Sequence, residues 1–398
     1  MSFAENRFRR STRILRWSGA WFIQDATNSP GRAPLKRTLT RPYTWYSALC
    51  LSTLFIIESG LIFWTLLFSF GMRKMFLNTL YVVLHCTVVT KTFLSVLSLS
   101  LNAKKFKKLM GKARHFETSR SFRPLPQEKR LISKGALRIW GQGILILVFV
   151  IIRNMDMMYM VDIRSIPLLI VLNLVLGSAS VLLVVYDGAY STVLKALVEI
   201  FLAYLQKAVY TLKTSRHVTG STATTMLEAC RLDVNYIQGM IRYTNRILRI
   251  AIMVAYGGNL VMLCGIAYCL VDPTSTWSLR IFCFCYGFLI TLDMVDVGFL
   301  VESLKLQTSK MKWTLQSMNF LGLPDSFSKQ VRFLHDCLDS DQMCLSACGF
   351  FKVNLTLLVS LNKKEDKEIG VSQVLVLGEN VELPDKELPA QEGAEVQS

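Results

Sequence analysis

The sequence predicts an all-α fold: a polytopic helical membrane bundle with its N-terminus in the cytoplasm. Of the 398 residues, 52% are apolar and only 18% are charged, whereas an average soluble domain is roughly 25% charged. The apolar residues come in blocks close to the ~20 residues that a helix needs to cross a hydrocarbon core. The basic residues, which give a net charge of +17, lie between these blocks. This pattern excludes a soluble enzyme and predicts a protein embedded in the lipid bilayer.

Six apolar blocks are predicted to span the membrane. They cover approximately residues 45–70, 77–101, 139–161, 166–186, 250–271 and 279–300. Each block has to be helical, because lipid offers no partner to an exposed backbone amide. The third block is the weakest, since Arg153 and Asp156 fall inside its outer third, where the two side chains could pair near the interface.

The distribution of Lys and Arg predicts the orientation. Residues 1–44 hold nine of these bases against two acids, residues 102–138 hold twelve against two, and residues 188–249 hold eight against three. Because short basic segments stay in the cytoplasm, all three are placed there. Residues 1–44 contain no apolar stretch typical of a signal peptide, so the first span is expected to act as the targeting signal. The bases do not gather along one amphipathic face, which argues against a nucleic-acid partner.

The long cytoplasmic loops, 102–138 and 188–249, are predicted to be largely helical. Apolar residues recur at helical spacing from Asp187 to Lys213 and again from Met226 to Leu248, with His217–Thr225 between the two stretches. Spans four and five are therefore expected to continue into the cytoplasm as helices that pack against each other.

The domain organisation predicted from these patterns has four parts. A basic N-terminus, 1–44, precedes the membrane bundle, 45–301, and a cytoplasmic segment with the start of an incomplete last span, 302–361, follows it. Residues 362–398 hold four Lys, nine acids and no aromatic residue. Such a composition predicts a disordered tail.

No motif in the chain predicts catalysis or cofactor binding. HExxH, GxxxxGK[ST] and GxSxG are all missing from the sequence. The residues His335, Cys337, Cys344 and Cys348 have the chemistry of zinc ligands, but their spacing matches no standard finger. A helix whose cysteines face apolar neighbours is the favoured interpretation. We therefore assign no enzymatic activity, catalytic residue, metal or cofactor.

Ionisable residues inside predicted spans are functional candidates by default, because burying a charge in lipid is costly. Glu58 lies in the middle of the first span, Lys91 lies two-thirds of the way through the second, and Asp293 and Asp296 share one face of the sixth. Two interpretations stay open. Lys91 could form a purely structural ion pair with Asp293 or with Glu58, or these groups could handle a ligand or an ion.

Polar and aromatic residues recur in the outer halves of the spans. This set consists of Tyr81, His85, Tyr159, Asn173, Asn259, Tyr268 and Tyr286. Such a mixture could line an outward-open pocket for a small amphipathic molecule. The alternative for each residue is ordinary packing or an interfacial aromatic belt.

The most specific stretch of the chain runs from Cys344 to Leu358. It resembles the segment that leads into the last span of insect gustatory receptors, where an Ala-Cys-Gly-like turn is followed by two apolar residues, Val-Asn and further leucines. The residues that carry the resemblance are Ala347, Cys348, Gly349, Phe350, Phe351, Lys352, Val353 and Asn354. The basic N-terminus and the long loops after spans two and four also look like this family.

The resemblance implies a seven-span receptor whose orientation is opposite to that of G-protein-coupled receptors. Family members are thought to assemble as tetrameric, ligand-gated cation channels in the plasma membrane. Their seventh helices line the pore, and the outer parts of the other spans cradle the ligand. The resemblance thus implies a gustatory chemoreceptor for small tastants that forms a homo- or hetero-oligomer with other receptor subunits.

The chain departs from the family at the seventh span. The family carries Thr-Tyr and, further on, Gln-Phe there, whereas Ser360-Leu361 is followed here by Asn362-Lys363-Lys364-Glu365-Asp366. The apolar stretch 353–361 has only nine residues, too few to cross a bilayer. We hypothesise an unspliced or alternative terminal exon, present either in the transcript or only in the gene model.

Two alternatives to the channel stay open, and the missing seventh span favours the first of them. One is a non-conducting or regulatory subunit without a pore helix. The other is a secondary transporter, which would have two similar halves and interrupted helices. The transporter is disfavoured, because no similar halves are present and Gly257-Gly258 is the one comparable break.

Overall fold

The computed structural model describes most of the chain up to the predicted last span. The described residues are 2–20, 42–69, 75–124, 166–215, 221–273, 277–317 and 325–338, with single residues 144, 148, 275, 343 and 345 and the strand residues 346–347 and 351–352. They belong to the first of two units, Met1–Leu358, while the second unit, Val359–Ser398, lies outside them. The predicted third span, apart from 144 and 148, and the acidic tail also lie outside the described residues.

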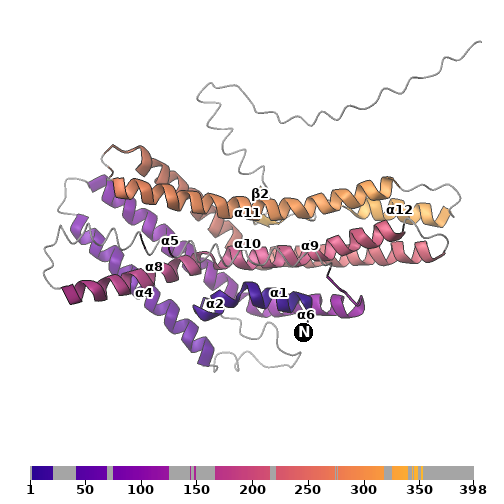
Figure 1. Ribbon diagram of the computed structural model, residues 1–398, viewed down its shortest axis with the longest axis horizontal. Coiled ribbons are helices and arrows are strands. Elements are labelled where there is room, and N and C mark those ends of the chain that lie inside the picture. The colour runs from indigo at the N-terminus through magenta and orange to yellow at the C-terminus, as the bar shows by residue number, and fades with distance from the viewer. Residues whose placement is uncertain are drawn as a thin grey trace, which may run out of the picture. The chain divides into compact units, whose positions relative to one another are not determined.

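The described part of the chain is helical, apart from two short strands (Figure 1). Its helices are α1 (Phe3–Ser11), α2 (Arg13–Trp17), α4 (Pro42–Ser69), α5 (Met75–Leu101), α6 (Ala103–Ser119), α8 (Ile166–Asp187), α9 (Ala189–Ser215), α10 (Ser221–Val271), α11 (Trp277–Gln316) and α12 (Asp325–Cys337). The strands are β1 (Ser346–Ala347) and β2 (Phe351–Lys352).

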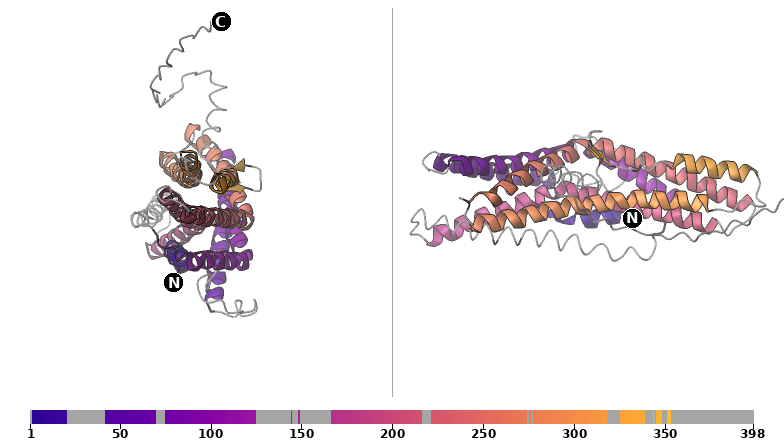
Figure 2. Two further views of the ribbon diagram at one scale, coloured as in Figure 1. Left: turned by 90° about the vertical axis from the view of Figure 1, so that its right-hand side faces the viewer. Right: turned by 90° about the horizontal axis from the view of Figure 1, so that it is seen from above.

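Helix α10 lies at the centre of the packing. It contacts α5, α6, α9, α11 and α12, while α9 also packs on α11 and α4 packs on α5 and α8. The long helices α9, α10 and α11 run alongside one another (Figure 1), and they appear end-on in the left view of Figure 2. Leu194 and Leu197 of α9 are buried in this core together with Ile241 and Leu248 of α10. The predicted fold class, an all-α helical bundle, is confirmed.

Several helices have the length and composition of membrane spans. Among the described residues, four segments are long and apolar enough to cross a bilayer: Val82–Leu101, Gly177–Thr214, Thr222–Val271 and Leu279–Gln316. The predicted first span coincides with α4, and the predicted fourth span coincides with α8. The number of spans and the cytoplasmic N-terminus stay predictions.

Two helices continue almost without interruption beyond the predicted spans. Gly188 alone separates α8 from α9, and its N–H still donates to the carbonyl of Val184. At the end of α5, Asn102 keeps a helical bond from its N–H to the carbonyl of Ser98 and accepts one from the N–H of Phe106. The described residues 189–215, 221–249 and 103–119 are thus helical where the sequence predicts helices. The start of α10 at Ser221 lies inside the predicted separator, His217–Thr225.

Helix α10 runs unbroken through Gly257 and Gly258, so these glycines do not interrupt the predicted fifth span. The glycines instead allow a close approach of α5. A Cβ at position 258 would lie 2.7 Å from Cδ of Lys91, and a Cβ at position 265 would overlap the side chain of Leu84. Gly258 and Gly265 are seven residues apart on α10, and their neighbours Lys91 and Leu84 are seven residues apart on α5. The same kind of contact therefore repeats after two helical turns.

The segment after α11 differs from the prediction. The favoured interpretation of His335, Cys337, Cys344 and Cys348 places them on one helix. This prediction is wrong, because α12 ends at Cys337. Residues 346–347 and 351–352 are extended rather than helical, because β1 and β2 pair antiparallel, with Ser346 opposite Lys352 and Ala347 opposite Phe351. Of the family-like residues, Cys348, Gly349, Phe350, Val353 and Asn354 lie outside the described residues.

Candidate functional site

The side chain of Lys91 is the centre of a buried polar contact among three helices. Its side chain is only 4% exposed, and its Nζ lies 2.8 Å from Oδ1 of Asp187. The same Nζ donates to Oδ1 of Asn259 over 2.6 Å. Because a buried ammonium group without partners is unstable, these two acceptors allow the charge to be retained inside the bundle.

The packing of the helices explains why this contact forms here. Helix α5 contributes Lys91, Asp187 is the last residue of α8, and α10 contributes Asn259. The adjacent Gly258 leaves room for the aliphatic stem of Lys91. The contact therefore fixes the register of three helices that are distant in sequence.

A second polar contact joins α9 to α11. The Nζ atom of Lys195 lies 2.7 Å from Oδ1 of Asp293 and 2.8 Å from Oδ2 of Asp296. The two carboxylates are one helical turn apart, so a single ammonium group can bridge them. Lys195 lies in the predicted cytoplasmic loop, and its sequence context alone does not distinguish it from other loop lysines.

Two tyrosines lie between these contacts along the helices. Tyr190 lies on α9, one turn after Asp187, the last residue of α8. Tyr256 lies on α10, one turn before Asn259. Their rings meet edge-on, with centroids 6.4 Å apart and an interplanar angle of 78°. Such edge-to-face pairs are favourable aromatic contacts. Along the chain, Tyr190 thus lies between Asp187 of the Lys91 contact and Lys195 of the second contact.

A third buried pair joins α4 to α5. The Nε2 atom of His85 lies 2.6 Å from Oε2 of Glu58, and the Glu58 side chain is 1% exposed. This pair and the Lys91 contact correct the predicted pairings. Lys91 pairs with Asp187 instead of Asp293 or Glu58, because Glu58 faces His85 and Asp293 faces Lys195.

The structure distributes the predicted ligand-lining residues over different surroundings. His85 contacts Glu58, Asn259 contacts Lys91, and the ring of Tyr286 stacks on Phe282 with centroids 5.5 Å apart. Tyr268 is 44% exposed near the end of α10. Tyr81 and Asn173 lie on the described helices α5 and α8, but their side chains, like the whole of Tyr159, lie outside the described residues.

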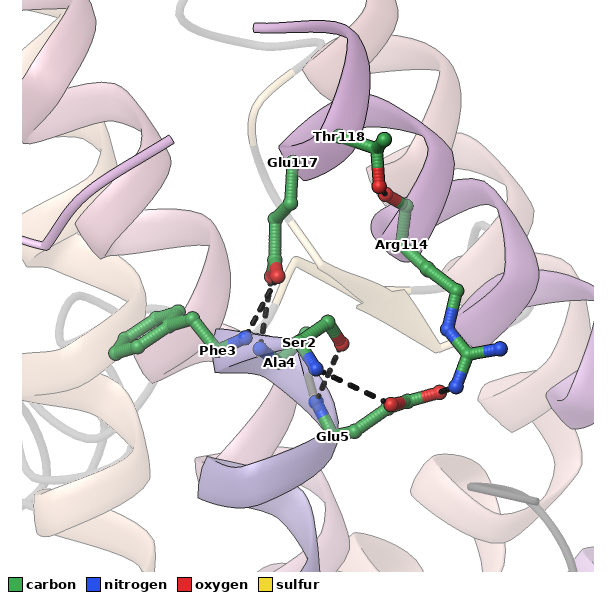
Figure 3. A network of polar contacts seen from close by, with 7 residues as sticks. All are labelled: Ser2, Phe3, Ala4, Glu5, Arg114, Glu117 and Thr118. Atoms are coloured by element: carbon green, nitrogen blue, oxygen red, sulfur yellow. Dashed lines mark hydrogen bonds and ion pairs between the residues drawn. The ribbon is translucent and has the colours of Figure 1, made fainter. Parts of the chain in front are cut away.

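The N-terminus forms a polar junction that the sequence analysis did not anticipate. Glu117 of α6 accepts hydrogen bonds from the N–H groups of Phe3 and Ala4, over 2.6 and 2.7 Å (Figure 3). It also accepts one from the hydroxyl of Tyr204 over 2.6 Å. A carboxylate at the first turn of a helix satisfies N–H groups that lack helical partners and opposes the helix dipole favourably. Glu117 thereby attaches α1 to α6 and α9.

A local signal for this N-terminal helix is present in the sequence. Ser2 and Glu5 form a reciprocal capping box, and Arg114 pairs with Glu5 over 2.5 Å. The Ser-x-x-Glu pattern predicts a helix start. Farther along, the hydroxyl of Tyr43 donates to the carbonyl of Arg16 over 2.9 Å, and partial burial lowers the pKa of the Arg16 guanidinium. The described residues 2–20 of the basic N-terminus are therefore packed on the bundle.

The comparison with protein families decides the class of this molecule. The family model described as "7tm Chemosensory receptor" matches residues 9–361. The chain belongs to this family of seven-transmembrane chemosensory receptors. The match includes the family-like residues Ala347–Asn354 and ends just before the acidic tail. The resemblance to the insect chemoreceptor superfamily is thus confirmed.

A solved structure supports the fold of the receptor. The insect olfactory receptor OR5 from Machilis hrabei superposes with a TM-score of 0.60 at 15% sequence identity. The alignment covers 90% of this chain and 95% of that chain. No curated protein sequence matches the chain. At this level of identity the likeness establishes the fold, while the family match establishes a multi-pass membrane receptor rather than an enzyme.

Proposed function

We propose that the chain is a gustatory-type chemoreceptor subunit of a ligand-gated cation channel in the plasma membrane, with a small tastant as its ligand. The family match over residues 9–361 carries this proposal. The Ala347–Asn354 segment, which resembles gustatory receptors, favours contact chemosensation over olfaction. Assembly with copies of itself or with other receptor subunits is part of the proposal.

We further propose that the N-terminus and the loops 102–138 and 188–249 face the cytoplasm. The excess of Lys and Arg in these segments supports this orientation. The ligand site would then lie among Tyr81, His85, Tyr159, Asn173, Asn259, Tyr268 and Tyr286. The close pairing of Glu58, Lys91, Asp293 and Asp296 with protein partners supports a structural role for the ionisable groups.

Functional expression tests this proposal. The chain would be expressed in oocytes, alone and with other receptor subunits, and challenged with panels of sugars, alkaloids, amino acids and volatile odorants. A cation current evoked by a non-volatile tastant is the expected result. The variant Tyr268→Ala should weaken the response, whereas Tyr210→Ala, an exposed tyrosine on α9, should not. Responses confined to volatile odorants would reassign the receptor to olfaction.

A non-conducting or regulatory subunit is a second candidate, because residues 353–398 contain no run long enough to cross a bilayer. A reporter fused after Ser398 separates the two candidates. Detection only after permeabilisation would support six spans and a regulatory subunit. Detection on intact cells would show a further crossing and favour the channel. A secondary transporter is less well supported, since α10 is continuous at Gly257-Gly258.

A further inference from the structure

The exposed face of α10 changes from cationic to apolar near residue 250. Arg242, Arg246 and Arg249 are all exposed and follow one another at spacings of four and three residues. The next residues on the same face are the exposed apolar Met253 and Leu260, inside the predicted fifth span. One continuous helix surface thus changes from arginine to lipid-compatible side chains at the predicted edge of the membrane.

The same change occurs at the junction of α5 and α6. Leu94, Leu97 and Leu101 are exposed along one face of α5. Beyond the end of α5, the exposed Lys104 and Lys108 follow at the same helical spacing, with the exposed Lys105 beside them. The opposite face of α6 is buried, because Phe106, Leu109, Met110, Ala113 and Phe116 pack into the bundle.

Three contacts hold the two cationic faces next to each other. The side-chain amide of Asn102 donates to the carbonyl of Ile247 over 3.1 Å, and the hydroxyl of Tyr236 donates to the carbonyl of Lys112 over 3.1 Å. The Nζ of Lys112 also lies 5.0 Å from the ring centroid of Tyr243. Helix α6 therefore runs antiparallel to this part of α10. We call the six residues Lys104, Lys105, Lys108, Arg242, Arg246 and Arg249 the basic band.

Acidic residues are sparse in the sequence around the basic band. The sequence has no acid from 103 to 116 or from 234 to 271. Within the described residues, no carboxylate pairs with Lys104, Lys105, Lys108, Arg242 or Arg246. All six cations lie within eight residues of Leu101 or Ile250, which corresponds to about 12 Å or less along a helix. This length is comparable to the Debye length of about 8 Å at physiological salt.

We propose that the basic band binds the phosphate headgroups of anionic phospholipids in the cytoplasmic leaflet, and binds lipids with several phosphates most tightly. The proposal rests on the cytoplasmic placement of these loops given above. A cytoplasmic orientation of the loops requires only that they be rich in Lys and Arg. In this protein the cations of the basic band also continue the lipid-facing surfaces of two neighbouring helices. Clustered Lys and Arg next to a span attract anionic lipid, and several phosphates can engage several of them at once.

Lipid fits this surface better than an acidic protein or a second copy of the chain does. An acidic partner would need to lie level with the membrane edge, where the exposed apolar stripes already require lipid. A second copy would oppose cations with cations at this surface, which is unfavourable without acids. Both occupants are distinguished from lipid by the experiment below.

The test uses the purified full-length chain in detergent with a fluorescent short-chain phosphatidylinositol 4,5-bisphosphate, followed by anisotropy. Each cation near a membrane surface contributes about 1 kcal/mol, which is about fivefold in affinity. The triple variant K104Q/K105Q/K108Q should therefore bind about 100-fold more weakly. The charge-retaining variant K104R/K105R/K108R should bind like the wild type. Wild-type binding by this variant would also show that α6 tolerates substitution at these three positions.

The control variant K329Q/R332Q removes one Lys and one Arg, both exposed, from α12, and should bind like the wild type. Wild-type affinity in K104Q/K105Q/K108Q would overturn the proposal, as would an equal loss in K329Q/R332Q, which would indicate unspecific attraction. Soluble inositol 1,4,5-trisphosphate binding as tightly as the lipid would assign the band to a free phosphate instead. Because no tastant or current enters this assay, its failure is distinct from failure of the proposed receptor function, which the oocyte recordings and the Ser398 reporter test.

Discussion

Gly258 lies against the aliphatic stem of Lys91, and a Cβ at position 258 would be 2.7 Å from the lysine Cδ and 3.0 Å from its Cγ. The lysine cannot easily move aside, since its Nζ is held by Asp187 and Asn259. A glycine on one helix thus makes room for a buried charge from another. This relationship connects the packing of α5 on α10 to the buried Lys91 contact.

Substitution of Gly258 by alanine should destabilise the receptor. Alanine normally stabilises a helix by roughly 0.5–1 kcal/mol relative to glycine. Here the added methyl group overlaps a constrained side chain, and overpacking of this kind costs about 1–3 kcal/mol. We expect a lower melting temperature for Gly258→Ala, measured by fluorescence-detected size exclusion after heating.

The adjacent glycine provides a matched control for this experiment. A Cβ at Gly257 would have nothing within 4 Å. Gly257→Ala should therefore leave the melting temperature unchanged or raise it slightly. Equal melting temperatures for the two alanine variants would show that α5 does not approach α10 this closely.

Loss of either partner of the Lys91–Asp187 pair should destabilise the bundle, and loss of Asp187 should do so more. Lys91 is 4% exposed and Asp187 is 20% exposed, so the cation has less access to water. Asp187→Ala leaves that cation with Asn259 alone, whereas Lys91→Met leaves a partly hydrated carboxylate. A double-mutant cycle in thermal unfolding should give a coupling energy of about 1–3 kcal/mol.

The partly exposed pair Lys305–Glu302, with 3.5 Å between charged atoms, is the comparison for this cycle. Glu302→Gln should change stability by less than about 1 kcal/mol, as is usual for surface ion pairs. A Lys91–Asp187 coupling no larger than the Lys305–Glu302 coupling would argue against the buried contact.

The Glu58–His85 pair should respond asymmetrically to substitution. Glu58→Gln keeps a neutral amide opposite the imidazole and should be tolerated. His85→Phe leaves a carboxylate that is 1% exposed without its partner, and loss of one member of a buried pair costs about 3–5 kcal/mol. We expect surface expression to fall more for His85→Phe, and Glu58→Gln added to it should restore part of the loss.

Substitution of Glu117 should detach the N-terminal helix. Glu117→Ala removes the acceptor of three hydrogen bonds, each worth about 1.5–3 kcal/mol when the acceptor is charged. Trypsin should then cut faster at Arg9, Arg10 and Arg13, which are exposed. Tyr204→Phe removes one of the three bonds and should give an intermediate rate.

The neighbouring Thr118, which is exposed and whose hydroxyl donates to the carbonyl of Arg114 in its own helix, provides the control. Thr118→Ala should be cut at the wild-type rate. If Glu117→Ala were also cut at that rate, the attachment of α1 would have to depend on its apolar contacts, such as buried Phe8, rather than on Glu117.

Hydropathy and helical periodicity predicted a large part of this protein. The apolar blocks that became α4, α8 and parts of α10 and α11 are visible in the sequence, because lipid demands long apolar helices. The periodic stretches Asp187–Lys213 and Met226–Leu248 likewise correspond to helices in the structure. The family resemblance of Cys344–Leu358 was visible because it depends on consecutive residues.

The sequence by itself determined the helical membrane class, the helical character of the long loops and the receptor family. Only the tertiary structure decided that Lys91 pairs with Asp187 and Asn259, that Asp293 pairs with Lys195, and that Glu117 holds the N-terminal helix. The physical reason is that periodicity reports the faces of one helix at a time. Which charged groups meet depends on the rotation and register of helices far apart in sequence, and close contacts such as that at Gly258 set both.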